Sequence, residues 1–293
     1  MTANPDLMVE KQFVRRASDR AVGTYDDHAA LERLVVDNLL ENLALIRIKP
    51  NTILDIGAGT GYCARGLVRR YPRAHTLLVD LSPLMLAYAR GQRPRWRSRQ
   101  RYVCADAEAL PVRDSSIDFV FSSLTFQWCN DLDRVFTECH RVLKPNGLLL
   151  FSSLGPDTLY ELRESWAAID ESPRINQFID MHDVGDALIR SGFSSPVLEC
   201  DPITVNYDDV NAVMRDLRGI GAVNSLRGRR RGLSTRRKLD RMAQHYEKFR
   251  CDDKLPATYE VVYAHAWRPA ANSRPQDGST VATFPLIELR RRS

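Results

Sequence analysis

The sequence predicts an α/β fold, in which a mostly parallel sheet carries helices on both faces. Segments of strand character alternate with segments of helical periodicity from residue 28 to residue 153, an order typical of such folds. A glycine-rich turn at residues 57–61 separates the first predicted strand from the helix after it. Acidic residues lie at the carboxyl ends of the first three strands, the edge where open α/β sheets bind ligands.

Five strands and four helices follow from the apolar pattern of this region. The predicted strands cover residues 52–56, 76–79, 101–104, 117–122 and 148–153. The predicted helices begin at residue 28, cover residues 62–71, begin at residue 83 and cover residues 132–143. Ser82 is the expected N-cap of the third helix, with Pro83 at its first position. Asp26 or Asp27 is expected to cap the first helix, and residues 145–147, Pro-Asn-Gly, are expected to form a turn.

After residue 153 the pattern changes to one richer in helix. Helices are predicted over residues 158–169, 183–191, 208–219 and 239–249, and strands over residues 197–205 and 259–267. The last strand is rich in β-formers and is expected to close the sheet. We expect an N-terminal arm or lid (1–27), a main domain (28–268) with lid inserts at 156–190 and 206–257, and a tail (269–293) that is disordered outside the fold.

Composition and charge exclude several classes of protein. The 293 residues are 44% apolar, enough for a sizeable core, and the net charge of +5 suits an acidic partner without identifying one. None of the six cysteines forms a C-x-x-C pair or lies at metal-ligand spacing from histidine, so we expect reduced thiols and no metal site. Without an apolar signal segment or membrane-spanning run, a cytoplasmic protein is expected.

The glycine turn predicts a nucleotide-like ligand, because bare main chain allows a close approach. Residues 59–64 formally fit the dinucleotide pattern G-x-G-x-x-A, with Asp80 where a ribose-binding acid would lie. Asp55, however, lies two residues before the first glycine, where a carboxylate would repel a pyrophosphate. S-adenosylmethionine (SAM) has no phosphate and carries an ammonium and a sulfonium group. The charge of Asp55 therefore favours SAM over a dinucleotide.

The acids at the strand ends complete the predicted SAM site. Asp80 is placed to accept hydrogen bonds from both ribose hydroxyls, and Asp106 from the adenine amino group. Helix capping is an alternative role for Asp80. Ser123 and Leu124 follow the fourth strand, where their backbone is expected to contact the methionine part of SAM. The predicted cofactor-binding residues are Asp55, Gly57, Ala58, Gly59, Gly61, Asp80, Leu81, Asp106, Ala107, Ser123 and Leu124.

Several motifs carry a resemblance to known enzymes. Residues 54–61, 79–82, 106–111, 119–123 and 141–147 resemble the class I SAM-dependent methyltransferases. This resemblance implies a Rossmann-like three-layer sandwich with a seven-stranded sheet whose last strand is antiparallel. Residues 124–128, 153–159, 178–185 and 217–224 narrow it to the malonyl-acyl-carrier-protein O-methyltransferases of biotin synthesis. That family methylates the free carboxylate of a malonyl thioester, so the resemblance implies this reaction, with malonyl-acyl carrier protein as substrate.

The resemblance, the position of residues after the fourth strand and the chemistry of a carboxylate substrate together suggest residues for the reaction. Tyr25 matches the tyrosine that closes over SAM in this family and is the expected catalytic residue, with packing of the arm as the alternative. Gln127 is expected to face the substrate, and Trp128 to fill the core. An arginine fork could clamp the substrate carboxylate, for which Arg218 is the first candidate and Arg215 the second. An ionised carboxylate needs no general base, and none stands out in the sequence.

Two arginine clusters indicate where an acidic partner could dock. One contains Arg227, Arg229, Arg230 and Arg231, and the other lies between residues 90 and 101. A solvated basic face is the simplest explanation. Positive charge would also steer an acidic carrier protein or contact nucleic acid phosphates. Because no aromatic RNA-binding motif is present, we favour the carrier protein.

Two other functions stay open on the sequence alone. A methyltransferase acting on a small molecule of the quinone type would usually need a base to deprotonate its substrate. A related family works as a respiratory-complex assembly factor and hydroxylase, using SAM on the same scaffold, and the fold by itself does not exclude this function.

Overall fold

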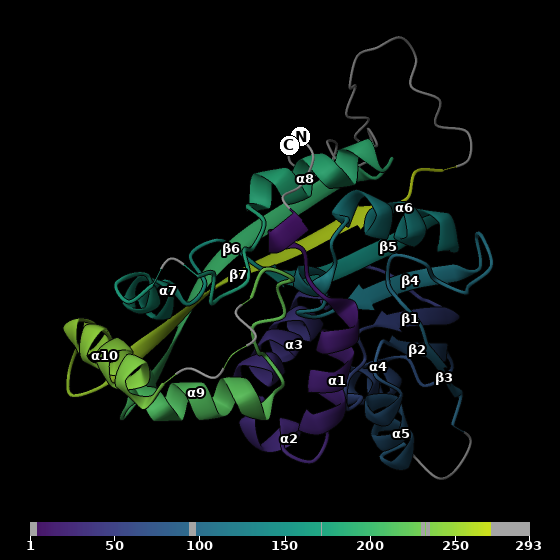
Figure 1. The fold of residues 1–293 in the computed structure, drawn as a ribbon. Helices are drawn as coiled ribbons and strands as arrows, with labels where there is room; N and C mark the ends of the chain where they lie inside the picture. Colours follow the sequence, from purple (N-terminus) through teal and green to yellow (C-terminus); the bar gives the residue numbers. More distant parts are fainter. Residues whose placement is uncertain (1–4, 94–97, 171, 230–231, 233–234, 271–293) are drawn as a thin grey trace.

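The computed structural model describes residues 5–93, 98–170, 172–229, 232 and 235–270. A seven-stranded sheet of order β3-β2-β1-β4-β5-β7-β6 forms its centre (Figure 1). The strands are β1 (Thr52–Ile56), β2 (His75–Asp80), β3 (Gln100–Cys104), β4 (Ile117–Ser122), β5 (Leu143–Leu154), β6 (Ser194–Tyr207) and β7 (Leu255–Trp267). Strands β1 to β5 pair in parallel, and β7 runs antiparallel to both β5 and β6. The expected sheet, with an antiparallel last strand, is confirmed.

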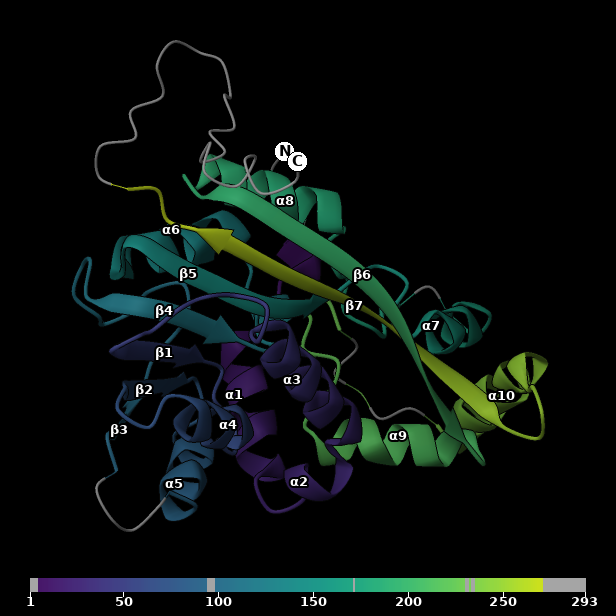
Figure 2. The ribbon, with the colours of Figure 1, turned by 180° about the vertical axis from the view of Figure 1, so that it is seen from behind.

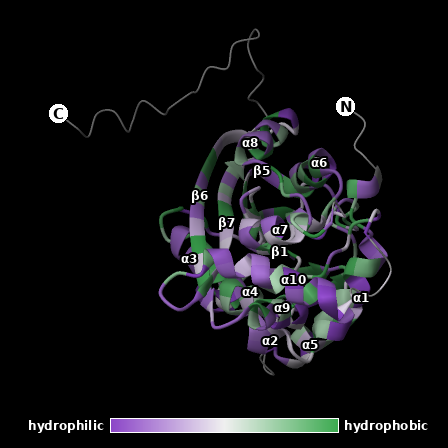
Figure 3. Cartoon of the chain, turned by 60° about the vertical axis from the view of Figure 1, so that its left-hand side comes forward, coloured by the Kyte–Doolittle hydropathy of each residue, from purple (hydrophilic) through white to green (hydrophobic). Residues whose placement is uncertain are grey.

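Helices cover both faces of the sheet, as the views from front and back show (Figures 1 and 2). They are α1 (Lys11–Ala21), α2 (Tyr25–His28), α3 (Ala30–Asn42), α4 (Tyr62–Arg70), α5 (Pro83–Gly91), α6 (Leu132–Val142), α7 (Tyr160–Ala167), α8 (Met181–Arg190), α9 (Val210–Gly219) and α10 (Arg236–Tyr246). Hydrophilic and hydrophobic residues alternate along them (Figure 3), as expected of helices with one face on a core. No described helix is long and apolar enough to cross a membrane.

The core lies on the two faces of the sheet because successive strand residues point to opposite sides. Ile53 and Phe119 belong to the cluster that includes residues of α3 and α4. Leu54 and Val120 belong to the opposite cluster, with residues of α6 and α8. Both faces are buried, which explains why the central strands read as continuous apolar runs.

The structure adds helices to the arm and corrects two local predictions. The N-terminal arm forms helices α1 and α2, although it contains few large apolar residues. Ala29, and neither Asp26 nor Asp27, is the N-cap of α3, and Asp26 instead accepts a hydrogen bond from Thr60 Oγ1 at 2.7 Å. Residues 145–147 lie within β5, where its register against β4 shifts.

Other predictions hold or fall outside the described residues. Ser82 caps α5, because its Oγ accepts the backbone N–H of Met85 at 3.1 Å. Arg230, Arg231 and residues 271–293 lie outside the part of the chain that the structure describes.

Candidate cofactor and substrate site

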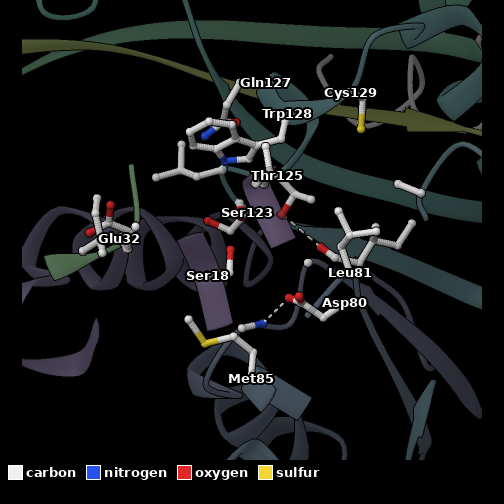
Figure 4. A pocket seen from close by; sticks show the side chains of 18 of the residues that line it. Ser18, Glu32, Asp80, Leu81, Met85, Ser123, Thr125, Gln127, Trp128 and Cys129 are labelled. Carbon is white, nitrogen blue, oxygen red and sulfur yellow. Dashed lines mark hydrogen bonds between the residues drawn. The ribbon is translucent and has the colours of Figure 1, made fainter. Parts of the chain in front are cut away.

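A cavity of about 190 Å³ lies at the carboxyl edge of the sheet, between the sheet and helices of the arm and of the second insert. In Figure 4, Gln127 and Trp128 lie on one side of it and Asp80 and Met85 on the other, while Glu32 marks one end. Its lining includes Tyr25, Gly57, Gly59, Asp80, Leu81, Asp106, Ala107, Ser123, Leu124 and Gln127. The structure therefore brings most of the predicted site residues together.

A smaller adjoining cavity contains other predicted residues. Asp55 and Ala58 line it, and Tyr25, Gly57 and Glu32 line both cavities. Gly61 lines neither of the two, since it forms the N-cap of α4. We call the two spaces the main cavity and the side cavity.

The turn between β1 and α4 presents bare backbone to both cavities. Gly57 has φ +75°, and a Cβ atom there would lie 1.8 Å from Thr125 Oγ1. Gly59 has φ +51°, but a Cβ atom there would have nothing within 4 Å. Both φ values favour glycine. Both the backbone conformation and the close approach of Thr125 therefore require glycine at position 57. At Gly59, the open space lets a ligand approach the main chain.

Asp80 organises this turn and the start of α5. Its Oδ2 accepts the backbone N–H of Gly59 at 2.9 Å, and its Oδ1 accepts that of Ser82 at 2.7 Å. A carboxylate oxygen can accept more than one hydrogen bond, so both oxygens can still receive ribose hydroxyls. Since the side chain of Ser82 caps α5, Asp80 need not be the cap of this helix. Burial raises the pKa of Asp80 above its ordinary value.

Asp106 is bound by a residue that the sequence did not indicate. Lys11 Nζ of helix α1 lies 2.7 and 2.6 Å from the two carboxylate oxygens of Asp106, and 2.8 Å from Glu108 Oε2. These contacts tie the arm to the end of β3. Contact of Asp106 with adenine stays a prediction.

Two acids in the side cavity have unmatched oxygens. Asp55 is 1% exposed, and neither its Oδ2 nor Glu32 Oε2 has a hydrogen-bond partner among the described residues. Burial raises the pKa of each carboxyl group to about 7, and the charge of Asp80 adds to the effect on Asp55. Glu32 was not among the predicted site residues, although the apolar spacing of Leu31, Val35 and Leu39 places it beside the buried stripe of α3.

These features fit SAM. Buried carboxylate oxygens without partners are costly in an empty protein, and the ammonium group of SAM would supply the missing donors and charge. Asp55 and Glu32 would hold this group, and Asp80 would hold the ribose. The main chain at Gly59 would lie directly against the ligand. A pyrophosphate would meet three carboxylates here, which disfavours a dinucleotide.

The role of Glu32 predicts a change in proton release. An ammonium group favours the ionised carboxylate, so SAM binding should release protons at about pH 6.5, below the raised pKa. We expect Glu32→Gln to weaken SAM binding about tenfold (about 1.4 kcal/mol) and to release fewer protons. Calorimetry in buffers of different ionisation enthalpy measures both quantities.

The raised pKa of Glu32 should also make the stability of the SAM-free protein depend on pH. A raised carboxyl pKa means that stability falls as pH rises from the ordinary value toward 7, so Glu32→Gln should flatten this decline. Glu41→Gln, at an exposed position of the same helix, is the control. Unchanged affinity and proton release in Glu32→Gln would exclude the contact with the ammonium group.

Neutral hydrogen-bonding groups face the main cavity near Tyr25. Burial, followed by the charges of Glu32, Asp80 and Asp26, raises the pKa of Tyr25 well above its ordinary value, so the phenol keeps its proton. Gln127 Oε1 is buried without a hydrogen-bond partner among the described residues. Trp128 was expected to fill the core, but it is partly exposed and lines the cavity.

The two candidate arginines lie elsewhere. Helix α9 turns Val213 and Leu217 inward, and Arg215 and Arg218 are exposed. Neither arginine is among the residues that line the main cavity. Lys11 is the one cation among those lining residues, and Asp106 and Glu108 already hold it.

The basic stretch divides into a structural part and an exposed part. Arg229 is 13% exposed, pairs with Glu10 at 2.6 Å, and stacks 4.0 Å from the ring centre of Phe13. It therefore holds α1 against the second insert. Arg227 is exposed.

Comparisons with known proteins agree with this site. A family model of a methyltransferase domain matches residues 54–151. The malonyl-acyl-carrier-protein O-methyltransferase of Laribacter hongkongensis is 50% identical over 284 residues, covering 94% of this chain and 96% of that protein. The enzyme of the same name from Methylovorus is 48% identical, covering 97% of both chains.

Solved structures support the fold. The YcgJ protein of Bacillus subtilis superposes with a TM-score of 0.59 at 14% identity, covering 80% of this chain and 98% of that one. Phosphoethanolamine N-methyltransferase 2 of Haemonchus contortus, solved with S-adenosylhomocysteine, gives 0.57 at 20% identity, covering 88% of this chain and 60% of that one. The fold is thus shared with methyltransferases, and identities near one half over nearly the full length show that this chain belongs to the malonyl-acyl-carrier-protein O-methyltransferase family.

Proposed function

We propose that this protein transfers the methyl group of SAM to the free carboxylate of malonyl-acyl carrier protein, giving the methyl ester that enters biotin synthesis. The carrying observation is the pair of joined cavities. Asp55 and Glu32 line the side cavity and suit a cationic cofactor, while Tyr25 and Gln127 line the main cavity, where a phenol and an amide can donate hydrogen bonds to an anion. Relatives across nearly the whole chain bear the name of this activity.

The proposed chemistry needs positioning rather than proton removal. When bound, SAM supplies an electrophilic methyl group on a sulfonium, which leaves as the neutral thioether of S-adenosylhomocysteine. The malonyl carboxylate is ionised near neutral pH and is already a nucleophile. Tyr25 and Gln127 can donate hydrogen bonds that orient one carboxylate oxygen, while α1 and α9 exclude water from the cavity. This arrangement needs no general base.

Tyr25 is the residue proposed to touch the reacting groups. Its protonated phenol can donate a hydrogen bond, so Tyr25→Phe should lower kcat about 10- to 100-fold, with a smaller effect on SAM binding. Tyr25→Ala should also weaken SAM binding, because the ring lines both cavities. Steady-state kinetics and SAM titration measure these effects. Wild-type kinetics in both variants would remove Tyr25 from the site.

One assay separates this function from the alternatives. Conversion of SAM to S-adenosylhomocysteine should require malonyl-acyl carrier protein, and mass spectrometry should find a malonyl methyl ester. Turnover with a phenolic quinone precursor instead would indicate a small-molecule methyltransferase. SAM binding without turnover on either substrate would favour an assembly factor or hydroxylase.

The acidic carrier protein is proposed to dock at the basic stretch of the sequence formed by Arg227, Arg229, Arg230 and Arg231, of which the structure describes the first two. Arg227 is exposed and can steer an acidic partner, whereas Arg229 supports the surface from below. Competition between carrier protein and tRNA for binding tests this proposal, because a nucleic-acid surface would prefer the tRNA.

A further inference from the structure

A second space, outside the main cavity, is not used by the proposed methyl transfer itself. It has a volume of about 890 Å³ and lies between the arm, the first insert and helix α9. Three residues, Trp128, Leu159 and Leu217, line both this groove and the main cavity. The groove is therefore continuous with the place where we put the reacting carboxylate, and we call it the outer groove.

The charge of the outer groove is strongly positive. Its lining holds four arginines, Arg16, Arg174, Arg218 and Arg229, and a single acid, Glu10. Asp170 binds Arg174, and Glu10 binds Arg229. Arg16 and Arg218 are exposed, and neither guanidinium has a polar partner among the described residues. Two unmatched guanidinium groups in one groove favour an anion with several oxygens, such as a phosphate.

The middle of the groove offers a polar acceptor between apolar walls. Asn176 is 6% exposed, and its Oδ1 has no hydrogen-bond partner among the described residues. Trp166, Ile175 and Phe178 lie along the same lining. A buried acceptor without a partner is costly, and an amide N–H of a ligand would satisfy it.

We propose that the outer groove binds the 4′-phosphopantetheine arm that carries the malonyl thioester. The arm has a phosphate at one end, two amides in the middle and the thioester at the other end. Arg16 and Arg218 would bind the phosphate, and Asn176 would accept an amide N–H. Trp128, which lines both spaces, lies where the acyl group would pass into the main cavity. Arg218 thus recognises the phosphate rather than the malonyl carboxylate. This inference rests on the proposed function.

The test compares substrates with and without the phosphate. For Arg16→Gln, Arg218→Gln and the double variant, kcat/KM is measured with malonyl-acyl carrier protein, malonyl-coenzyme A and malonyl-pantetheine, which has no phosphate. We expect each single variant to lose about three- to tenfold on the two phosphate-bearing substrates, and little on malonyl-pantetheine. The matched controls are Arg20→Gln on α1 and Arg215→Gln on α9, which are exposed but do not line the groove.

A binding measurement distinguishes recognition of the 4′-phosphopantetheine group from recognition of the body of the carrier protein. Holo carrier protein contains 4′-phosphopantetheine and the apo form lacks it, so Arg218→Gln should reduce the preference for the holo form. Asn176→Ala should raise KM for malonyl-pantetheine but not for a malonyl thioester without amides, with melting temperature and SAM affinity as checks of folding.

Three results would overturn the proposal. They are equal losses on malonyl-pantetheine, equal losses in the Arg215→Gln control, or an unchanged preference for the holo form. If the wild-type protein methylates none of the malonyl substrates, the proposed function fails, which is distinct from activity without dependence on the groove.

Discussion

Asp80→Ala should abolish SAM binding at ordinary concentrations. Both carboxylate oxygens of Asp80 bond to backbone N–H groups, one of them in the glycine turn, and the same oxygens face the cavity for the ribose. The substitution leaves Gly59 N–H without its acceptor and removes the ribose contact together. We expect Kd to rise at least about 100-fold, or about 3 kcal/mol, as measured by calorimetry.

Variants of graded chemistry separate the two roles of Asp80. Asp80→Asn keeps one acceptor oxygen and should fall between the wild type and Asp80→Ala. Glu199→Gln, at an exposed position of β6, is the control for loss of an acid and should bind SAM normally. An affinity of Asp80→Ala equal to that of the wild type would place the ribose elsewhere.

Gly57→Ala should destabilise the fold and eliminate the cofactor site. The new Cβ would lie 1.8 Å from Thr125 Oγ1, at a backbone φ of +75° that alanine rarely adopts. The turn or the segment around Thr125 must move, and both line the cavities. We expect a loss of about 2–4 kcal/mol in the free energy of unfolding, together with loss of SAM binding.

Two further variants identify the cause of that loss. In Gly57→Ala with Thr125→Gly the collision is gone but the backbone strain stays, so stability should recover in part. Gly91→Ala, where a Cβ would meet nothing within 4 Å, should be nearly neutral. If Gly57→Ala melts like the wild type and binds SAM, the tight fit against Thr125 is not important.

The sequence predicted those parts of the molecule that depend on local pattern. Strand and helix periodicity gave the sheet, and the position of Asp80 at a strand end placed it at the ligand edge, because topology sends all parallel strands to that edge. Lys11 was not predictable in this way. It meets Asp106 across 95 residues of sequence, a contact set by how the arm docks.

The direction in which side chains point from a helix was also not predicted correctly. The motif suggested Arg218 as a clamp, but only the rotation of α9 shows that Leu217 faces inward and Arg218 outward. The spacing of Val213 and Leu217 contained this information. Glu32 was missed for a related reason, since an acid beside an apolar stripe usually lies at the surface.

The contacts of the arm also bear on the order of events in turnover. The start of helix α1 is held by two ion pairs, Lys11 with Asp106 and, one residue earlier, Glu10 with Arg229, and residues of this helix line the main cavity. Since α1 forms part of the wall of the main cavity, we expect exchange of SAM and its product to require release of these ion pairs. Because Glu10 and Arg229 also line the outer groove, the same release would change the groove in which we propose that the acyl arm binds.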